Sequence, residues 1–137
     1  MGKEIAVLGC KFKISSTMGT ISAASLQATS QPSQNVSVSG KGVYFDKITV
    51  AIATAKISAV VPGTTGTGVL ASGSVDITAT GSNITENNKK VALKGDKGTK
   101  TINFTFTTTS TPASTTPVPV PVTIEIDDPG QTDVIAL

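Results

Sequence analysis

Hydrophobic and polar residues alternate along several short stretches of the chain. A period of two residues is that of a strand with one buried face. The clearest stretch runs from Pro119 to Ile126, with one face formed by Val120, Val122, Ile124 and Ile126. This pattern predicts a half-buried strand. Prolines cannot donate to a ladder, so the portion 117–121 is predicted to lie at a sheet edge or in an extended approach segment.

Similar alternation recurs at 36–38, 47–53, 75–79 and 101–106, between clusters of Gly, Asn and Pro. Thr, Ser, Val, Ile and Gly dominate the chain, and β-branched residues favour the pleated surface of a sheet. Signals for helices are almost absent. The sequence therefore predicts an all-β fold of many short strands, with Phe104 and Phe106 in the core and Phe12 joining them.

Two segments have the composition of loops. One is 62–68, which is rich in glycine, and the other is 107–117, which consists of Thr, Ser, Ala and Pro. The second is predicted to be a flexible exposed connection before the final strand. The length of 137 residues fits one domain, so residues 1–137 are expected to form a single β domain.

The composition limits what the domain can bind. There is no Trp, with one Tyr and four Phe, so the core must come from aliphatic residues. We therefore expect either thin packing layers or a chain that gains stability from a partner. The formal net charge is +2, and the lysines are scattered among acidic residues. No basic face is expected, which argues against nucleic acid as a partner.

Residues that carry chemistry are scarce. The chain has no histidine and one cysteine, Cys10, which is interpreted as an inert thiol because no histidine can pair with it. The acidic cluster Glu125, Asp127 and Asp128 could hold calcium, but a solvated strand end before a turn is favoured. The segment 94–98 is interpreted as a tight turn and not as a phosphate loop. We therefore expect no catalytic residue, metal ligand or cofactor.

Three segments together resemble the PAAR-like proteins that cap the spikes of contractile injection machines. They are VLGCKFKIS at 7–15, NKKVALKGDKG at 88–98 and VTIEIDDPGQTDVIAL at 122–137. Together these segments comprise 36 of the 137 residues. The resemblance implies a compact conical β-fold whose broad base docks on a trimeric spike protein, VgrG-like or of the tail hub-spike kind, and whose apex points at a target membrane.

The resemblance also implies a function and a location. A structural tip protein would be assembled in the bacterial cytoplasm as part of a phage tail, a type VI secretion system or a related particle. It would be delivered to or through a target envelope, in some members with effector cargo. Members of the family often hold a metal at the apex through His and Cys. This chain has no His and only Cys10, so no metal is expected.

Two other hypotheses compete with the spike tip. An immunoglobulin-like β-sandwich, serving as an adhesin or as a decoration protein of a capsid or tail, would use the same short strands. A hydrolase using Asp46, Asp76 or Asp96 ranks last, because no pair of these residues has a catalytic spacing. The candidate partner-binding residues, chosen for apolar density, are Phe12, Val120, Val122, Ile124 and Ile126.

Overall fold

The computed structural model describes residues 2–22 and 24–136, with the side chain of Asn83 excepted. These residues form strands and connections but no helix, which confirms the predicted all-β class. The strands are β1 (Lys3–Glu4), β2 (Lys11–Ser15), β3 (Gly19–Ser22), β4 (Leu26–Ala28), β5 (Ser37–Val38), β6 (Lys41–Gly42), β7 (Lys47–Ile52), β8 (Ala55–Ala59), β9 (Thr64–Leu70), β10 (Gly73–Thr78), β11 (Gly81–Glu86), β12 (Lys89–Val91), β13 (Lys97–Thr108), β14 (Thr115–Asp128) and β15 (Ile135–Ala136).

Two antiparallel sheets make the body of the molecule. The larger has six strands in the order β2-β14-β13-β9-β8-β3, and the smaller has three in the order β10-β7-β4. Strand β10 of the smaller sheet lies against β13 and β14 of the larger one. The main hydrophobic core lies between these sheets and includes Ile48, Val50, Ile52, Val75 and Ile77.

The two longest strands, β13 and β14, form one hairpin at the centre of the larger sheet. Its ladder runs from Lys97↔Glu125 to Thr107↔Thr115. The side chains predicted to share an inward face are fully buried, which confirms the period-two reading: Phe104, Phe106, Val120, Val122, Ile124 and Ile126. Strand β2 joins β14 only between Thr123 and Asp128. The portion 117–121 therefore has a hydrogen-bonded neighbour on one side only, as its prolines predicted.

Both predicted loops are shorter in the structure. In the first segment, the turn of the β8–β9 hairpin ends at Gly63, and β9 begins at Thr64. Gly68 belongs to this strand and not to a loop. A Cβ at this position would collide with the ring of Phe106, so the glycine makes room for an aromatic side chain of the core. In the second segment, Thr107 still pairs with Thr115, since threonine favours strands, and only 109–114 form the loop.

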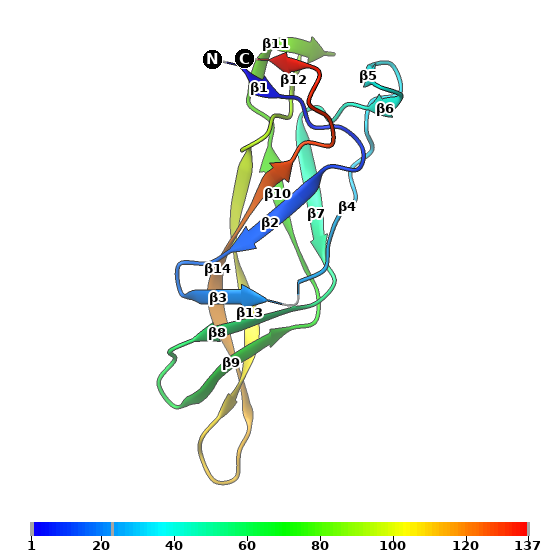
Figure 1. The fold of residues 1–137 in the computed structure, drawn as a ribbon. Helices are drawn as coiled ribbons and strands as arrows, with labels where there is room; N and C mark the ends of the chain where they lie inside the picture. Colours follow the sequence, from blue (N-terminus) through cyan, green and yellow to red (C-terminus); the bar gives the residue numbers. More distant parts are fainter. Residues whose placement is uncertain (1, 23, 137) are drawn as a thin grey trace.

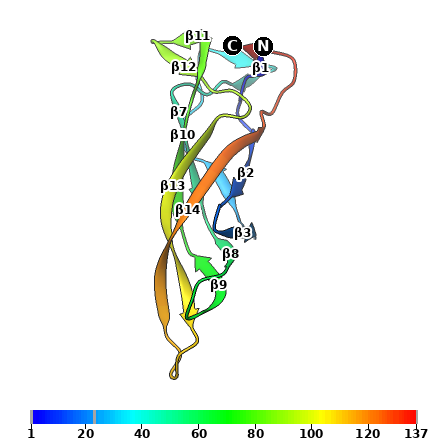
Figure 2. The ribbon, with the colours of Figure 1, turned by 90° about the vertical axis from the view of Figure 1, so that its left-hand side faces the viewer.

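The molecule is long and tapers toward one end (Figures 1 and 2). Both termini lie at the wider end, beside the small strands β1, β5, β6, β11, β12 and β15. We call this the hairpin end. The opposite end, here called the narrow end, is the tip of the β13–β14 hairpin, with the β8–β9 hairpin beside it.

Candidate docking face

Three small two-stranded pairs stand at the hairpin end. Two are ordinary hairpins, β5–β6 and β11–β12, and the third, β15–β1, is formed by the two ends of the chain. All three have the same register: Val38↔Lys41 with Ser37↔Gly42, Glu86↔Lys89 with Thr85↔Lys90, and Ala136↔Lys3 with Ile135↔Glu4. The chain ends thus complete a pair that matches the two continuous hairpins.

The two continuous hairpins turn in the same way. Ser39 and Gly40 have φ of 53° and 79°, and Asn87 and Asn88 have φ of 51° and 65°. Two successive residues with positive φ form the turn whose twist matches the two flanking strands, and Asn and Gly tolerate that conformation best. Local sequence therefore explains why each of these segments folds into a tight hairpin.

After each pair, the chain enters a central ring of three hydrogen bonds. The amide of Ala6 donates to the carbonyl of Ala92 (2.9 Å), Ala92 donates to Tyr44 (2.9 Å), and Tyr44 donates to Ala6 (3.2 Å). Each segment thus donates to one neighbour and accepts from the other. A closed cycle of this kind requires three segments arranged around a common axis.

Two further sets of contacts close in the same cyclic order. The bridges that flank the ring are Ile5↔Leu93, Phe45↔Val91 and Val7↔Val43. A second set of amides, each 2.8 Å from its acceptor, runs from Leu8 to Gly42, from Asp46 to Lys90 and from Lys94 to Glu4. The hairpin end therefore has approximate threefold symmetry within one chain.

We define three modules from these contacts. The first module comprises 134–136 with 3–10, the second 36–46 and the third 84–96. Each passes into a strand of the body that begins with a lysine, at Lys11, Lys47 and Lys97. A small second core lies within the modules, with Ile5, Val7, Val43, Val91, Leu93 and Ala136 buried. Its half-buried rim includes one residue from the same position of each module: Val36, Ile84 and Val134.

The symmetry is imperfect where the modules join the body. The first and third modules turn through glycines at positive φ, Gly9 (94°) and Gly95 (91°). In both, an amide closes the turn, from Cys10 to Val7 and from Asp96 to Leu93. The second module is two residues shorter here, and Asp46, with φ of 70°, makes the turn alone. A short polar side chain is among the few that tolerate this conformation.

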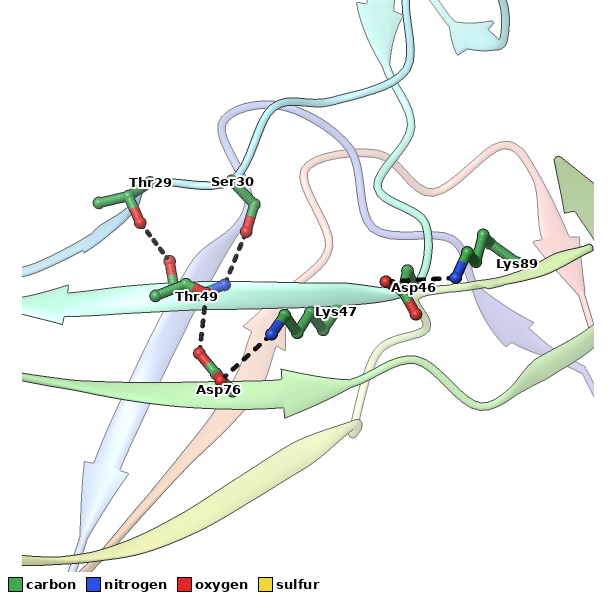
Figure 3. Close-up of polar contacts among 7 residues, drawn as sticks. All are labelled: Thr29, Ser30, Asp46, Lys47, Thr49, Asp76 and Lys89. Atoms are coloured by element: carbon green, nitrogen blue, oxygen red, sulfur yellow. Dashed lines mark hydrogen bonds and ion pairs between the residues drawn. The ribbon is translucent and has the colours of Figure 1, made fainter. Parts of the chain in front are cut away.

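Figure 3 shows the polar contacts around this shortened turn. Lys89 reaches from the third module to Asp46 of the second, with Nζ 4.0 Å from a carboxylate oxygen. Further along β7, Lys47 pairs with Asp76 at 3.7 Å, and the Thr49 hydroxyl donates to Asp76 at 2.8 Å. The four charged side chains are each more than half exposed, so each ion pair adds little to stability.

Asp96 is the buried charged residue of the third module. Its carboxylate accepts the amide of Leu93 at 2.9 Å and both the amide and the hydroxyl of Thr80. These bonds fix the turn of the module to the start of β11. The three aspartates considered as catalytic carboxylates thus have separate structural surroundings, because Asp46 forms a turn and Asp76 lies on the exposed face of β10.

The other residues singled out from the sequence also have structural partners. Lys13 pairs with Glu125 (3.4 Å) and Asp127 (4.0 Å), and Asp128 accepts the amide of Gly130 in the turn that follows β14. Burial, with the charge of Asp128, raises the pKa of the Cys10 thiol to about 11. The thiol is therefore neutral at physiological pH and a poor nucleophile, which agrees with its interpretation as inert.

The predicted partner-binding residues do not form a surface. Val120, Val122, Ile124 and Ile126 are 0% exposed and belong to the main core, so that prediction is wrong for them. The alternating pattern identified the inward face of β14, and its outward face carries the prolines and threonines. Phe12 is half-buried and packs against the same core.

The sequence reasoning missed the modules themselves. The signal was present, because Leu93-Lys94-Gly95-Asp96-Lys97 can be aligned with Val7-Leu8-Gly9-Cys10-Lys11 without a gap. The lysines of the three strand pairs, Lys3, Lys41 and Lys89, also lie at one register position.

Comparisons with known proteins found no matching family model, curated protein or solved structure. Within the described ranges 2–22 and 24–136, no group of three or more His, Cys, Asp or Glu could hold a metal ion. The same residues include no helix long and apolar enough to cross a membrane.

Proposed function

We propose that the protein is a PAAR-like structural tip protein, which docks through its hairpin end, as one copy, on a trimeric spike protein. The observation that carries the proposal is the closed ring of hydrogen bonds between Ala6, Ala92 and Tyr44. It places three similar modules around one axis. A homotrimer viewed along its own axis presents three identical surfaces, and one chain can contact all three equally only if it repeats its own contact surface three times.

The small size of the three strand pairs supports the same role. Each pair has only two strands, which are marginally stable alone in water. The outward residues Ser37, Thr85 and Ile135 occupy equivalent positions and are exposed. Covering these pairs with a partner would remove their unpaired strand edges from water, together with the exposed side chain of Ile135.

The distribution of charge supports contact of the narrow end with a target membrane. No residue is charged in 14–40, 57–75 or 101–124, and these ranges supply most of the narrow half of the molecule. Val60, at the β8–β9 turn, is 97% exposed. Moving charged groups out of water is the largest cost of entering a bilayer, so an uncharged tip lowers that cost.

A structural role also accounts for the carboxylates. Asp46, Asp76 and Asp96 each serve a turn, a strand or a buried hydrogen-bond network, and the chain has no histidine. We therefore propose that the chain acts by assembly and not by catalysis. Assembly would take place in the bacterial cytoplasm, as part of a tail or injection particle.

Native mass spectrometry of the chain co-expressed with a VgrG-like trimeric spike protein tests this proposal. The expected species is one trimer with one copy of this chain. A complex with three copies, or with none, would contradict the proposal. Free multimers of this chain alone would favour the adhesin or decoration role.

A further inference from the structure

One charged residue recurs at the same position in all three modules. Lys3, Lys41 and Lys89 occupy one register position of their strand pairs, opposite Ala136, Val38 and Glu86. All three are exposed. The threefold symmetry of the module backbones therefore places three ammonium groups around the axis of the hairpin end.

Each lysine reaches toward the turn of the next module. Lys41 Nζ donates to the carbonyl of Gly130 at 3.4 Å, beside the turn of the first module. Lys89 Nζ lies 4.0 Å from the Asp46 carboxylate of the second. Lys3 lies beside Gly95 of the third. The three contacts follow the cyclic order of the backbone ring, so the lysines are equivalent in direction as well as in register.

Two of these contacts lie in open grooves between modules. Lys3 and Gly95 line a groove of about 390 Å³. Lys89 and Asp46 line another of about 420 Å³. The contacts of Lys41 (3.4 Å) and Lys89 (4.0 Å) are long for a hydrogen bond and an ion pair, so a partner can replace them at little cost.

The acidic residues of the strand pairs do not recur in this way. Glu4 corresponds to Gly42 and Lys90, and Glu86 corresponds to Val38 and Ala136. Lysine is thus the one charge that all three strand pairs share among the described residues. A threefold-symmetric partner can place the same residue of each of its three chains against one of the three lysines.

We propose that Lys3, Lys41 and Lys89 each bind a carboxylate from one of the three chains of the spike, so that the spike end carries a ring of three symmetry-related Asp or Glu residues. This inference rests on the proposed docking function and adds the chemistry of the partner. A carboxylate is the group that lysine pairs with at a protein interface, and such charges set register and orientation more than total affinity.

The test measures binding of single and combined variants to the immobilised spike trimer by biolayer interferometry. Each of Lys3→Ala, Lys41→Ala and Lys89→Ala is expected to weaken affinity about 2- to 5-fold, and by similar factors, because the partner groups are identical. The triple Lys→Glu variant is expected to lose about 100-fold or more through repulsion. Lys56→Glu and Lys100→Glu, both on exposed lysines of the body, serve as controls that leave binding unchanged.

The outcomes separate this inference from the docking proposal. Unchanged binding of the triple variant would overturn the lysine ring and leave docking intact. An effect confined to one of the three lysines would also overturn it, since a threefold partner must act on all three. Failure of the parent chain itself to bind the trimer would overturn the docking proposal, and the inference with it. Thermal unfolding of each variant separates lost binding from lost folding.

Discussion

At the scale of single residues, Cys10 joins the first module to β2. Its amide closes the turn on Val7, and its thiol packs against the main core. Burial is the main reason that its pKa rises from 9.0 to about 11, and the nearby charge of Asp128 adds to it. In the unfolded chain the thiol is in water and regains its ordinary pKa.

This pKa shift makes stability depend on pH in a defined window. Between pH 9 and 11, the unfolded chain loses the thiol proton while the folded chain keeps it, so the contribution of Cys10 to stability falls as pH rises. Urea unfolding of the parent and of Cys10→Ala at pH 8, 9, 10 and 11 measures this. The difference in unfolding free energy between parent and variant is expected to shrink with pH. A difference that stays constant over this range would contradict the burial of the thiol.

At the scale of the elements, β10 crosses β13 very closely at the start of the long hairpin. A Cβ on Gly98 would collide with the backbone carbonyl of Asp76. Backbone cannot give way as a flexible side chain can. The φ of Gly98 lies outside the left-handed region, so backbone conformation does not require glycine here. The close contact between the two sheets does.

Gly98→Ala is therefore expected to destabilise the protein by about 1–3 kcal/mol or more, as overpacking does. Gly73→Ala is the matched control, because a Cβ there would lie 3.4 Å from side-chain atoms of Ile102 and Leu70, an ordinary contact. The control is expected to stay within about 1 kcal/mol of the parent, since alanine also restricts the unfolded chain. Equal unfolding midpoints in urea for the two variants would contradict the close crossing of β10 and β13.

The elements show what the sequence could and could not reveal. The alternation of Val120 to Ile126 predicted a strand and its buried face, because side-chain period depends on local geometry alone. The same pattern misled the choice of partner-binding residues, since apolar density identifies the core before it identifies an interface. Glycines at 66 and 68 indicated a loop, whereas Gly68 makes room for a ring that is distant in sequence.

The threefold arrangement was harder to detect for physical reasons. What the modules share is a set of backbone hydrogen bonds, which almost any residue can make. The first module is divided between the two ends of the chain, and the second lacks two residues at its turn. A repeat of this kind leaves only a few side-chain traces, such as Lys3, Lys41 and Lys89.

At the scale of the whole molecule, the two ends differ in composition and in symmetry. The hairpin end is charged and built of three modules, whereas the narrow end consists of the tips of the β13–β14 and β8–β9 hairpins, with no charged residue in 57–75 or 101–124. Threefold order is thus present where we propose a threefold partner and is absent at the free tip. The central claim is that each module contacts the same surface of a different spike chain.

Site-specific photo-crosslinking tests this claim most directly. A benzophenone amino acid is placed singly at the equivalent exposed positions Ser37, Thr85 and Ile135, and at Val60 of the narrow end as a control. Each variant is irradiated with the spike trimer, and the crosslinked peptides are identified by mass spectrometry. We expect the three module positions to crosslink to the same spike peptide and Val60 to none. Crosslinks from only one module, or to three different peptides, would contradict threefold docking.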